Sequence, residues 1–335
     1  MRRITSLFCL NSNRRQARTL LAALSMTLLA SAASAWTVSS RELVDLEYAS
    51  DQSLRILVSA PAAVAPGLYR WPPDAAKPTL LCHISGPATF SFDRAQVIER
   101  ISGVASIVRI YNPLNCRKLA TIRVDARALD TDVRGRHVAV AVRLSDGKYE
   151  LRLYSRRGRL IARTSVGRNV EMGFAPDGRS LVNFDLSDRG ATIWRVPSLA
   201  SVAPPAWLGD AESTFVPGST YVKRYGNDTL SVVRWPSGKV VHAVPASRAV
   251  RLRELSTSGR YGALHERRDV GESLDWMDFA TRRRVPLTTG SIDHASINAA
   301  GNAVAWSLRD ADDSNQVHIQ RASIPGADGP LVVSD

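Results

Sequence analysis

A tight turn followed by an apolar strand recurs along this chain at a nearly constant interval. The clearest copy is PDGRS, around Gly178, which leads into the stretch SLVNFD. The anchor residues of the recurring turns are Gln52, Arg94, Gly135, Gly178, Gly218, Gly259 and Gly301. Successive anchors lie 40 to 43 residues apart. Because unrelated hairpins have no reason to keep a common spacing, this interval indicates an internal repeat.

Each repeat has the same internal order. A short stretch leads into the turn, and an apolar stretch such as HVAVAV leaves it. A polar loop such as SDGK then precedes a third stretch with period-two alternation, such as YELRLYS, and a fourth such as KVVHAVP ends the unit. Short alternating stretches between turns rich in Gly, Pro, Asn and Asp predict β-strands, and no window of residues 36–335 has a convincing helical period.

Four antiparallel strands in about 42 residues are typical of a β-propeller blade. A single four-stranded sheet has two apolar faces to bury, and a closed ring of such sheets buries them all. The sequence therefore predicts an all-β fold, a seven-bladed β-propeller of four-stranded antiparallel blades, as one domain over residues 36–335. Two β-sandwich domains are the alternative, but sandwiches give no reason for the repeat. We expect WTVSS (36–40) and PLVVSD (330–335) to meet in the last blade.

Residues 1–35 have the layout of a secretory signal peptide. Arginines without acidic partners precede the apolar run TLLAALSMTLLA, and the small-residue pattern Ala33-Ser34-Ala35 follows it. We expect cleavage after Ala35. A retained membrane anchor is the alternative, but the apolar run is shorter than the ~18 residues that a spanning helix needs. No later segment of the sequence could span a bilayer, so we expect no transmembrane segment after cleavage. The predicted location is the periplasm or the cell exterior, with the export route left open.

The remaining composition argues against nucleic acid as a partner. Removing the five arginines of residues 1–35 lowers the formal net charge from +13 to +8, and only five of the 44 basic residues are lysine. An arginine bias of this kind reflects genome composition more than ligand choice. Cys82 and Cys116 remain after cleavage, and an oxidising compartment would allow them to form a disulfide. The alternative is a pair of small buried apolar side chains.

One repeat resembles a known family. FAPDGRSLV (174–182), followed by ATIWRVPS (191–198), is similar to the Ser-Pro-Asp-Gly repeat of TolB-like propellers, which are related to WD-repeat propellers. The other repeats keep the same spacing with different residues, and the Gly-His and Trp-Asp dipeptides of WD repeats are missing. The resemblance implies an exported bacterial propeller that acts as a non-catalytic scaffold in envelope assemblies.

Charged residues recur at the start of the predicted innermost strand, five to eight residues before the turn anchors. The set comprises Asp45, Glu47, Asp130, Asp132, Glu171, Glu212, Arg253, Glu254, Asp293 and His294. Only the second repeat, at residues 87–89, lacks such a residue. Because innermost strands line the axial channel of a propeller, we expect an acidic funnel at one mouth, surrounded by arginine-rich outer turns such as RRGR (156–159). Polar residues that merely cap turns are the alternative interpretation.

The sequence contains no residues that form a known catalytic or metal-binding motif. G-x-S-x-G is absent, and the six histidines do not pair at metal-ligand spacing. The leading hypothesis is a monomeric, cofactor-free scaffold that binds an envelope protein or peptide through Asp130, Asp132, Glu171, Glu212, Arg253, Asp293 and His294. A propeller enzyme, such as a lactonase or a glycan-acting hydrolase or lyase that uses the axial carboxylates with a divalent metal, is the second. Binding of lipopolysaccharide by the basic rim is the third.

Overall fold

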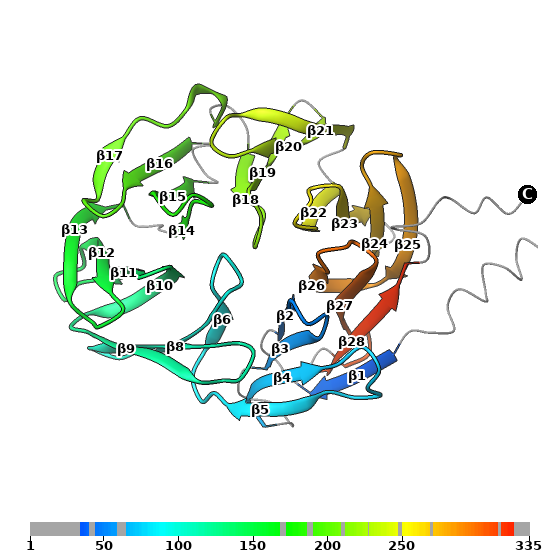
Figure 1. Ribbon diagram of the computed structural model, residues 1–335, viewed down its shortest axis with the longest axis horizontal. Helices are drawn as coiled ribbons and strands as arrows, with labels where there is room; N and C mark the ends of the chain where they lie inside the picture. The colour runs from blue at the N-terminus through cyan, green and yellow to red at the C-terminus, as the bar shows by residue number, and fades with distance from the viewer. Residues whose placement is uncertain are drawn as a thin grey trace, which may run out of the picture.

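A computed structural model describes residues 34–39, 44–58, 65–167, 172–185, 190–208, 212–226, 228–246, 250–268, 271–313 and 316–324. These residues form seven four-stranded antiparallel sheets arranged as a ring around a central axis (Figure 1). The only helix among the described residues is one 3-10 turn, η1 (Ala206–Leu208). The predicted fold class, a seven-bladed β-propeller, is therefore confirmed. No helix in the described part of the chain is long and apolar enough to cross a membrane.

The blades follow one another in chain order, and each runs from an innermost to an outermost strand. Blade 1 consists of β2 (Val44–Tyr48), β3 (Leu54–Val58), β4 (Gly67–Trp71) and β5 (Thr79–His83). Blade 2 consists of β6 (Ala88–Phe90), β7 (Val97–Ile101), β8 (Ser106–Tyr111) and β9 (Lys118–Val124). Blade 3 consists of β10 (Arg127–Arg134), β11 (His137–Arg143), β12 (Tyr149–Ser155) and β13 (Leu160–Val166). Blade 4 consists of β14 (Met172–Phe174), β15 (Ser180–Asp185), β16 (Gly190–Arg195) and β17 (Ala200–Val202). Blade 5 consists of β18 (Glu212–Phe215), β19 (Tyr221–Gly226), β20 (Thr229–Arg234) and β21 (Lys239–Pro245). Blade 6 consists of β22 (Val250–Leu255), β23 (Tyr261–Arg268), β24 (Gly271–Asp278) and β25 (Arg283–Thr289). Blade 7 consists of β26 (Ser291–Ile297), β27 (Ala303–Arg309), β28 (Gln316–Ser323) and β1 (Ser34–Ser39).

The N-terminal strand closes the ring. β1 pairs with β28 in antiparallel register, with Trp36 opposite Ile319, and so becomes the outermost strand of blade 7. The Trp36 ring also lies 5.0 Å from that of Tyr69 in blade 1, centroid to centroid. The expected closure in the last blade is therefore observed for the N-terminal segment. Residues 330–335, the other half of that prediction, lie outside the described residues, as do residues 1–33 of the predicted signal peptide.

The apolar core is divided among the interfaces between blades. Seven buried hydrophobic clusters occur, and each one combines residues of two adjacent blades. The closing interface is one of them, since Trp71 of blade 1 and Ile319 of blade 7, both fully buried, belong to a single cluster. Each sheet thus buries both of its faces against neighbours, which is the physical reason for the closed ring.

All seven turn anchors adopt the same left-handed backbone conformation. Their φ angles run from +55° to +78°, and this range includes the two anchors that are not glycine, Gln52 and Arg94. Glycine reaches this region without steric cost, whereas an L side chain there costs about 1 kcal/mol. The repeat inferred from the sequence therefore holds at the level of single backbone angles, even where the residue type has changed.

Candidate functional site

The turn between β6 and β7, residues 91–96, points into the middle of the ring (Figure 1). The Phe92 amide donates a 2.8 Å hydrogen bond to Asp132 of blade 3, and the Gly218 amide of blade 5 donates a 2.8 Å bond to the Phe92 carbonyl. The Phe92 ring packs against Phe215 of blade 5, with centroids 5.3 Å apart. One turn of blade 2 therefore contacts both the neighbouring blade 3 and the distant blade 5, and we call residues 91–96 the axial plug.

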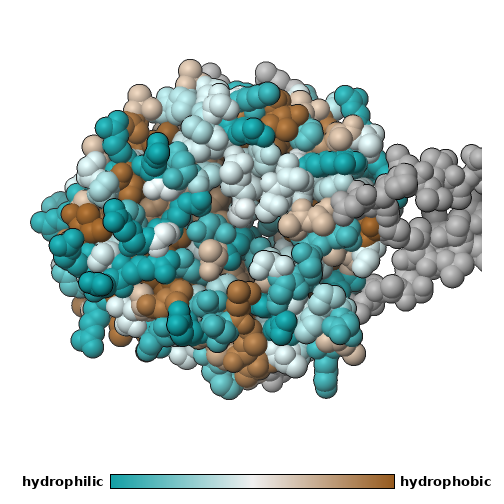
Figure 2. All heavy atoms as spheres, in the orientation of Figure 1, coloured by the Kyte–Doolittle hydropathy of each residue, from teal (hydrophilic) through white to brown (hydrophobic). Residues whose placement is uncertain are grey.

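Side chains fill much of the central opening that the ribbon leaves. In the space-filling view, atoms lie across most of the middle of the ring, and most of the face in view is hydrophilic with scattered hydrophobic groups (Figure 2). This agrees with the contacts of the axial plug. The axial plug therefore occupies part of the central channel of this propeller.

Arg94 of the axial plug is a largely buried cation surrounded by carboxylates. Its guanidinium lies 3.3 Å from an oxygen of each of three side chains: Asp45 and Glu47 of blade 1, and Glu254 of blade 6. The Arg94 side chain is only 16% exposed. A planar guanidinium with five N–H donors suits several carboxylates at once, which a lysine ammonium does less well. Arg94 therefore links blades 1, 2 and 6 at the axis.

One cation does not fully compensate three buried carboxylates. Burial raises the pKa of Glu47 to about 8, although Arg94 acts to lower it and the neighbouring carboxylates add to the rise. Burial likewise raises the pKa of Glu254 to about 7, again against the effect of Arg94. Burial acts to lower the pKa of Arg94, but the three carboxylates outweigh it and raise that pKa, so Arg94 stays protonated. The cluster therefore holds a permanent cation and carboxyl groups that titrate near neutral pH.

Aspartates of the innermost strands join each blade to the next. An innermost strand has one edge without a partner strand, so its backbone N–H groups need other acceptors. Asp45 accepts from the Phe90 amide at 3.3 Å, Asp130 from the Met172 amide at 2.9 Å, and Asp132 from the Phe174 amide at 2.7 Å. In every case the amide belongs to the following blade. These aspartates thus have a structural role at the inner edges of the sheets.

The remaining predicted residues lie on innermost strands but take part in separate interactions. Glu212 pairs with Arg251 at 3.4 Å, and both side chains are exposed. Asp293 pairs with Arg309 at 2.6 Å, and His294 has Nδ1 3.8 Å from an Asp45 oxygen. Burial lowers the pKa of His294.

Arg253 belongs to a chain of polar contacts within blade 6. It stands at a break in the pairing register of β22 and donates to Nδ1 of the buried His265, at 3.2 Å from Nε and 2.9 Å from Nη2. His265 Nε2 in turn lies 3.1 Å from Glu272. Because arginine can only donate, Nδ1 accepts from Arg253 and Nε2 donates to Glu272. Burial and, to a smaller extent, Arg253 lower the pKa of His265.

The expected acidic funnel does not form as a free set of carboxylates among the described residues. Asp45, Glu47 and Glu254 face Arg94, whereas Asp130 and Asp132 accept backbone N–H groups. The physical reason is that bare carboxylates in a narrow channel would repel one another, and nearby donors lower that cost. Glu171 lies outside the described residues. That this residue set binds a partner stays a prediction.

Two cavities lie next to the axial plug. The larger, about 460 Å³, is lined by turns of blades 1, 2, 5, 6 and 7 and by the β8–β9 turn. Its charged lining consists of Glu47, Asp93, Arg94 and Glu254, and its apolar lining includes Leu114, which is 47% exposed. The smaller cavity, about 300 Å³, also contacts Arg94 and extends to residues deeper on the innermost strands. We call the larger cavity the hairpin-face cavity.

The axial plug was not predicted, although the sequence carried a signal for it. The second repeat lacks the acidic residue of the others and has arginine where five of the seven repeats have glycine. A charged side chain in a left-handed turn indicates a compensating contact, because that conformation is unfavourable for it. What the sequence did not reveal is the direction of the turn, which depends on contacts with blades 3 and 5.

The described residues include no group of three or more His, Cys, Asp or Glu side chains placed to hold a metal ion. The carboxylates of Asp45, Glu47 and Glu254 converge on the guanidinium of Arg94. The residues present at the axis therefore suit a buried cationic side chain.

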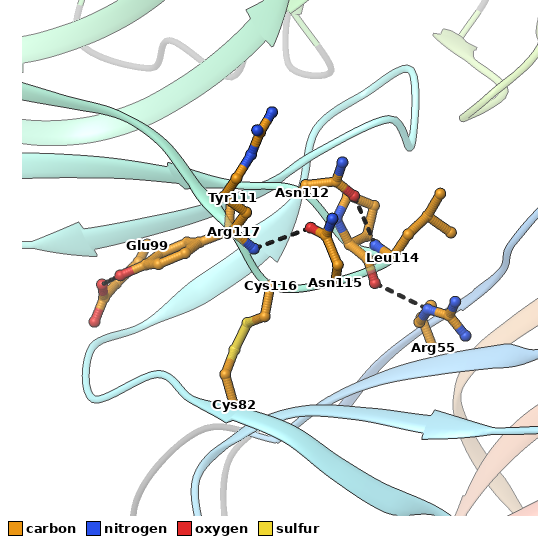
Figure 3. The surroundings of a disulfide bond; sticks show 10 residues. Arg55, Cys82, Glu99, Tyr111, Asn112, Leu114, Asn115, Cys116 and Arg117 are labelled. Carbon is orange, nitrogen blue, oxygen red and sulfur yellow. Dashed lines mark hydrogen bonds between the residues drawn. A yellow bond between two sulfur atoms is a disulfide. The ribbon is translucent and has the colours of Figure 1, made fainter.

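The structure joins Cys82 and Cys116 in a disulfide (Figure 3). Cys82 lies on β5, the outermost strand of blade 1, and Cys116 lies in the β8–β9 turn of blade 2, with Cα atoms 6.1 Å apart. Nearby, Arg55 of blade 1 donates to the Pro113 carbonyl of the same turn at 2.9 Å. Closing a segment of 34 residues contributes about 4 kcal/mol in the chain-entropy description. The disulfide thus reinforces one interface between blades.

Comparisons with known proteins identify the fold. No protein-family model and no curated protein matches this chain. Among solved structures, a chain of the mitotic checkpoint complex matches with a TM-score of 0.53 and 12% identity, covering 85% of this chain and 91% of that one. The WD40 β-propeller domain of Doa1 matches with a TM-score of 0.51 and 10% identity, over 87% and 97% of the two chains. Hsv2 of Kluyveromyces lactis matches with a TM-score of 0.50 and 14% identity, over 66% and 69%.

These identities are too low to transfer a function. As many as 902 solved chains match, so the likeness concerns an architecture shared by many proteins. The chain has the fold of a WD40-like β-propeller.

Proposed function

We propose that this protein is a non-catalytic scaffold that binds a protein or peptide partner on the face that carries the hairpin-face cavity. The observation that carries the proposal is the axial plug, which lies at the centre of the ring and contributes Asp93 and Arg94 to the lining of this cavity. A preformed concave surface built from the turns of several blades is a suitable place for a partner, because little ordering is needed on binding. One of the similar solved chains was itself determined within a multiprotein complex, which supports the same class of function.

The lining of the cavity favours a basic anchor residue on the partner. Three carboxyl groups, those of Glu47, Asp93 and Glu254, line the cavity together with one guanidinium, that of Arg94. A lysine or arginine of the partner would complement the excess of acidic groups, while apolar contacts with Leu114 and Leu255 would surround it.

We further propose that the protein acts in the bacterial periplasm or outside the cell. The signal-like residues 1–35 support this, and the Cys82–Cys116 disulfide suits an oxidising compartment. Cleavage after Ala35 would leave Trp36 as the first residue, still paired with Ile319 in blade 7. N-terminal sequencing of the protein purified from its native cells tests this, since a chain that begins at Met1 would contradict it.

The partner proposal is tested with two matched surface variants. Leu114→Arg places a positive charge at the hairpin-face cavity, and Val240→Arg places the same charge at the 51% exposed Val240 on β21. In crosslinking pulldowns, we expect wild type and Val240→Arg to capture the same partner and Leu114→Arg to lose it. Thermal melts verify that both variants fold. Equal capture by both variants, or metal-dependent hydrolysis of a lactone or glycan by the purified chain, would contradict the proposal.

A further inference from the structure

A third cavity, of about 590 Å³, lies between blades 3 and 4, away from the axial plug. Its lining residues are Arg136, His137, Ser155, Arg156, Arg157, Arg159, Ile161 and Pro197. Four of these eight residues are arginines, and none is acidic. We call this cavity the arginine groove.

Two adjacent turns of blade 3 hold the four arginines in place. Arg136 belongs to the β10–β11 turn, and the other three belong to the β12–β13 turn. The Arg156 amide donates to the Arg136 carbonyl at 3.1 Å, which joins the two turns. The Arg159 amide donates to the Ser155 hydroxyl at 3.2 Å, and the φ of +80° at Gly158 allows the turn to stay tight. The positive charges are therefore presented by a fixed backbone.

The arginine groove lacks the carboxylate partners that other arginines of this protein have. Within the described residues, no carboxylate oxygen forms an ion pair with any of the four guanidinium groups, whereas Arg260 pairs with Asp278 at 2.8 Å and Arg284 with Asp275 at 2.6 Å. The Arg156 Nε atom is buried and has no hydrogen-bond partner. Burial and the charge of Arg136 both lower the pKa of His137. The arginine groove therefore has an excess of positive charge, and the buried N–H group at Arg156 Nε is available to donate a hydrogen bond to a ligand.

We propose that the arginine groove binds a phosphate-bearing anion. Guanidinium groups donate paired hydrogen bonds to phosphate oxygens, and a dianionic group would relieve the repulsion among four neighbouring cations. The groove has room for two adjacent phosphate groups or for a phosphorylated sugar. A nucleic-acid strand suits it less, because His137 is the only ring among its lining residues on which a base could stack. This site is separate from the hairpin-face cavity and does not depend on the function proposed for it.

Calorimetry on the full chain with pyrophosphate tests this proposal at low ionic strength. We expect wild type to bind and the double variant Arg157→Gln/Arg159→Gln to bind about 30-fold or more weakly, because it loses two charge-assisted donor groups. Arg127→Gln/Arg143→Gln is the matched control. This control removes two positive charges as well. Arg127 and Arg143 are exposed and lie opposite each other at the other end of blade 3, and within the described residues neither forms an ion pair with a carboxylate. We expect the control to change affinity less than threefold, and thermal melts verify that both variants fold.

The source of the phosphate group is identified with a second set of probes. Vesicles of phosphatidylcholine containing phosphatidylglycerol are compared with vesicles of phosphatidylcholine alone. Binding of pyrophosphate alone indicates a soluble ligand, and binding to the anionic vesicles that Arg157→Gln/Arg159→Gln abolishes indicates a lipid headgroup. Absence of binding to both probes overturns the proposal. Equal losses in both double variants, or equally tight binding of a glutamate oligomer, would overturn it as well.

Discussion

Arg94 occupies a turn position that is glycine in five of the seven blades, and it accepts a φ of +59° there. The unfavourable backbone angle is offset by contacts that glycine lacks, namely ion pairs with Asp45, Glu47 and Glu254. An arginine here is thus a structural requirement of the axis. The same cluster contributes Glu47, Arg94 and Glu254 to the lining of the hairpin-face cavity, so the recognition that we propose there would depend on residues that also stabilise the axis.

Replacing Arg94 tests this dependence. Arg94→Met removes the cation and leaves three carboxyl groups buried without it, so we expect the free energy of unfolding to fall by about 3 kcal/mol. Urea denaturation at pH 9, above the native pKa values of Glu47 and Glu254, measures the loss. Arg157→Met is the matched control, because that arginine is exposed and forms no ion pair with a described carboxylate, and it should change stability by less than about 0.5 kcal/mol. Equal effects would show that Arg94 is not a structural centre.

The raised pKa of Glu47 predicts a pH dependence with a definite sign. Its native pKa of about 8 lies above the ordinary value of 4.5, so the folded protein binds the proton more tightly than the unfolded chain does. The Glu47 carboxyl group makes its full contribution to the free energy of unfolding below about pH 4.5, and this contribution is lost as the pH rises towards 8. Glu254 and Asp132, with pKa values raised to about 7, act in the same direction.

Glu47→Gln mimics the protonated form and should flatten this dependence. Between pH 5 and pH 8, we expect the unfolding free energy of wild type to fall by on the order of 2 kcal/mol more than that of the variant. Chemical denaturation at several pH values measures the difference. Identical slopes for both proteins would contradict the pKa that we assign to Glu47.

At the scale of elements, the inner edges of the blades are closed by side chains. A short innermost strand such as β14 (Met172–Phe174) forms few backbone hydrogen bonds within its own sheet. Aspartates of the preceding blade accept hydrogen bonds from its free amide groups. Asp132 accepts from three backbone amides, those of Phe92, Val133 and Phe174. It thus joins β10 to both the axial plug and the next blade.

Asp132→Asn tests this role with little change of shape. The amide group of asparagine has one acceptor oxygen, so its NH₂ must face a backbone N–H that the carboxylate had accepted. Because Asp132 is only 3% exposed, we expect a loss of about 2 kcal/mol in unfolding free energy. Asp146→Asn, in the exposed β11–β12 loop, is the control and should change stability little. A neutral result at Asp132 would argue against the interblade bonds.

For the whole molecule, closure of the ring depends on β1. Without it, β28 would present a free outer edge, and the interface of blades 7 and 1 would lose Trp36. An unpaired edge strand favours association between chains.

Two truncations separate ring closure from loss of the signal-like segment. A chain that begins at Trp36 keeps the pairing with β28 and should remain folded and monomeric. A chain that begins at Ser40 loses it, and we expect a melting temperature lower by several degrees together with oligomers. Thermal melts and light scattering measure the two outcomes. Equal stability of the two truncations would show that β1 is not needed for closure.

The sequence alone determined the architecture of this protein, because a regular turn and an alternating strand pattern are local properties. Even the irregular anchors Gln52 and Arg94 could be placed by spacing. The charged residues of the innermost strands were also predicted, but their partners were not. Only the tertiary structure brings Arg94 of blade 2 to carboxylates of blades 1 and 6, and the turns of blade 3 into one arginine groove. The physical reason is that a repeat fixes where each strand lies in the ring, whereas the direction of a turn depends on contacts between blades far apart in the chain.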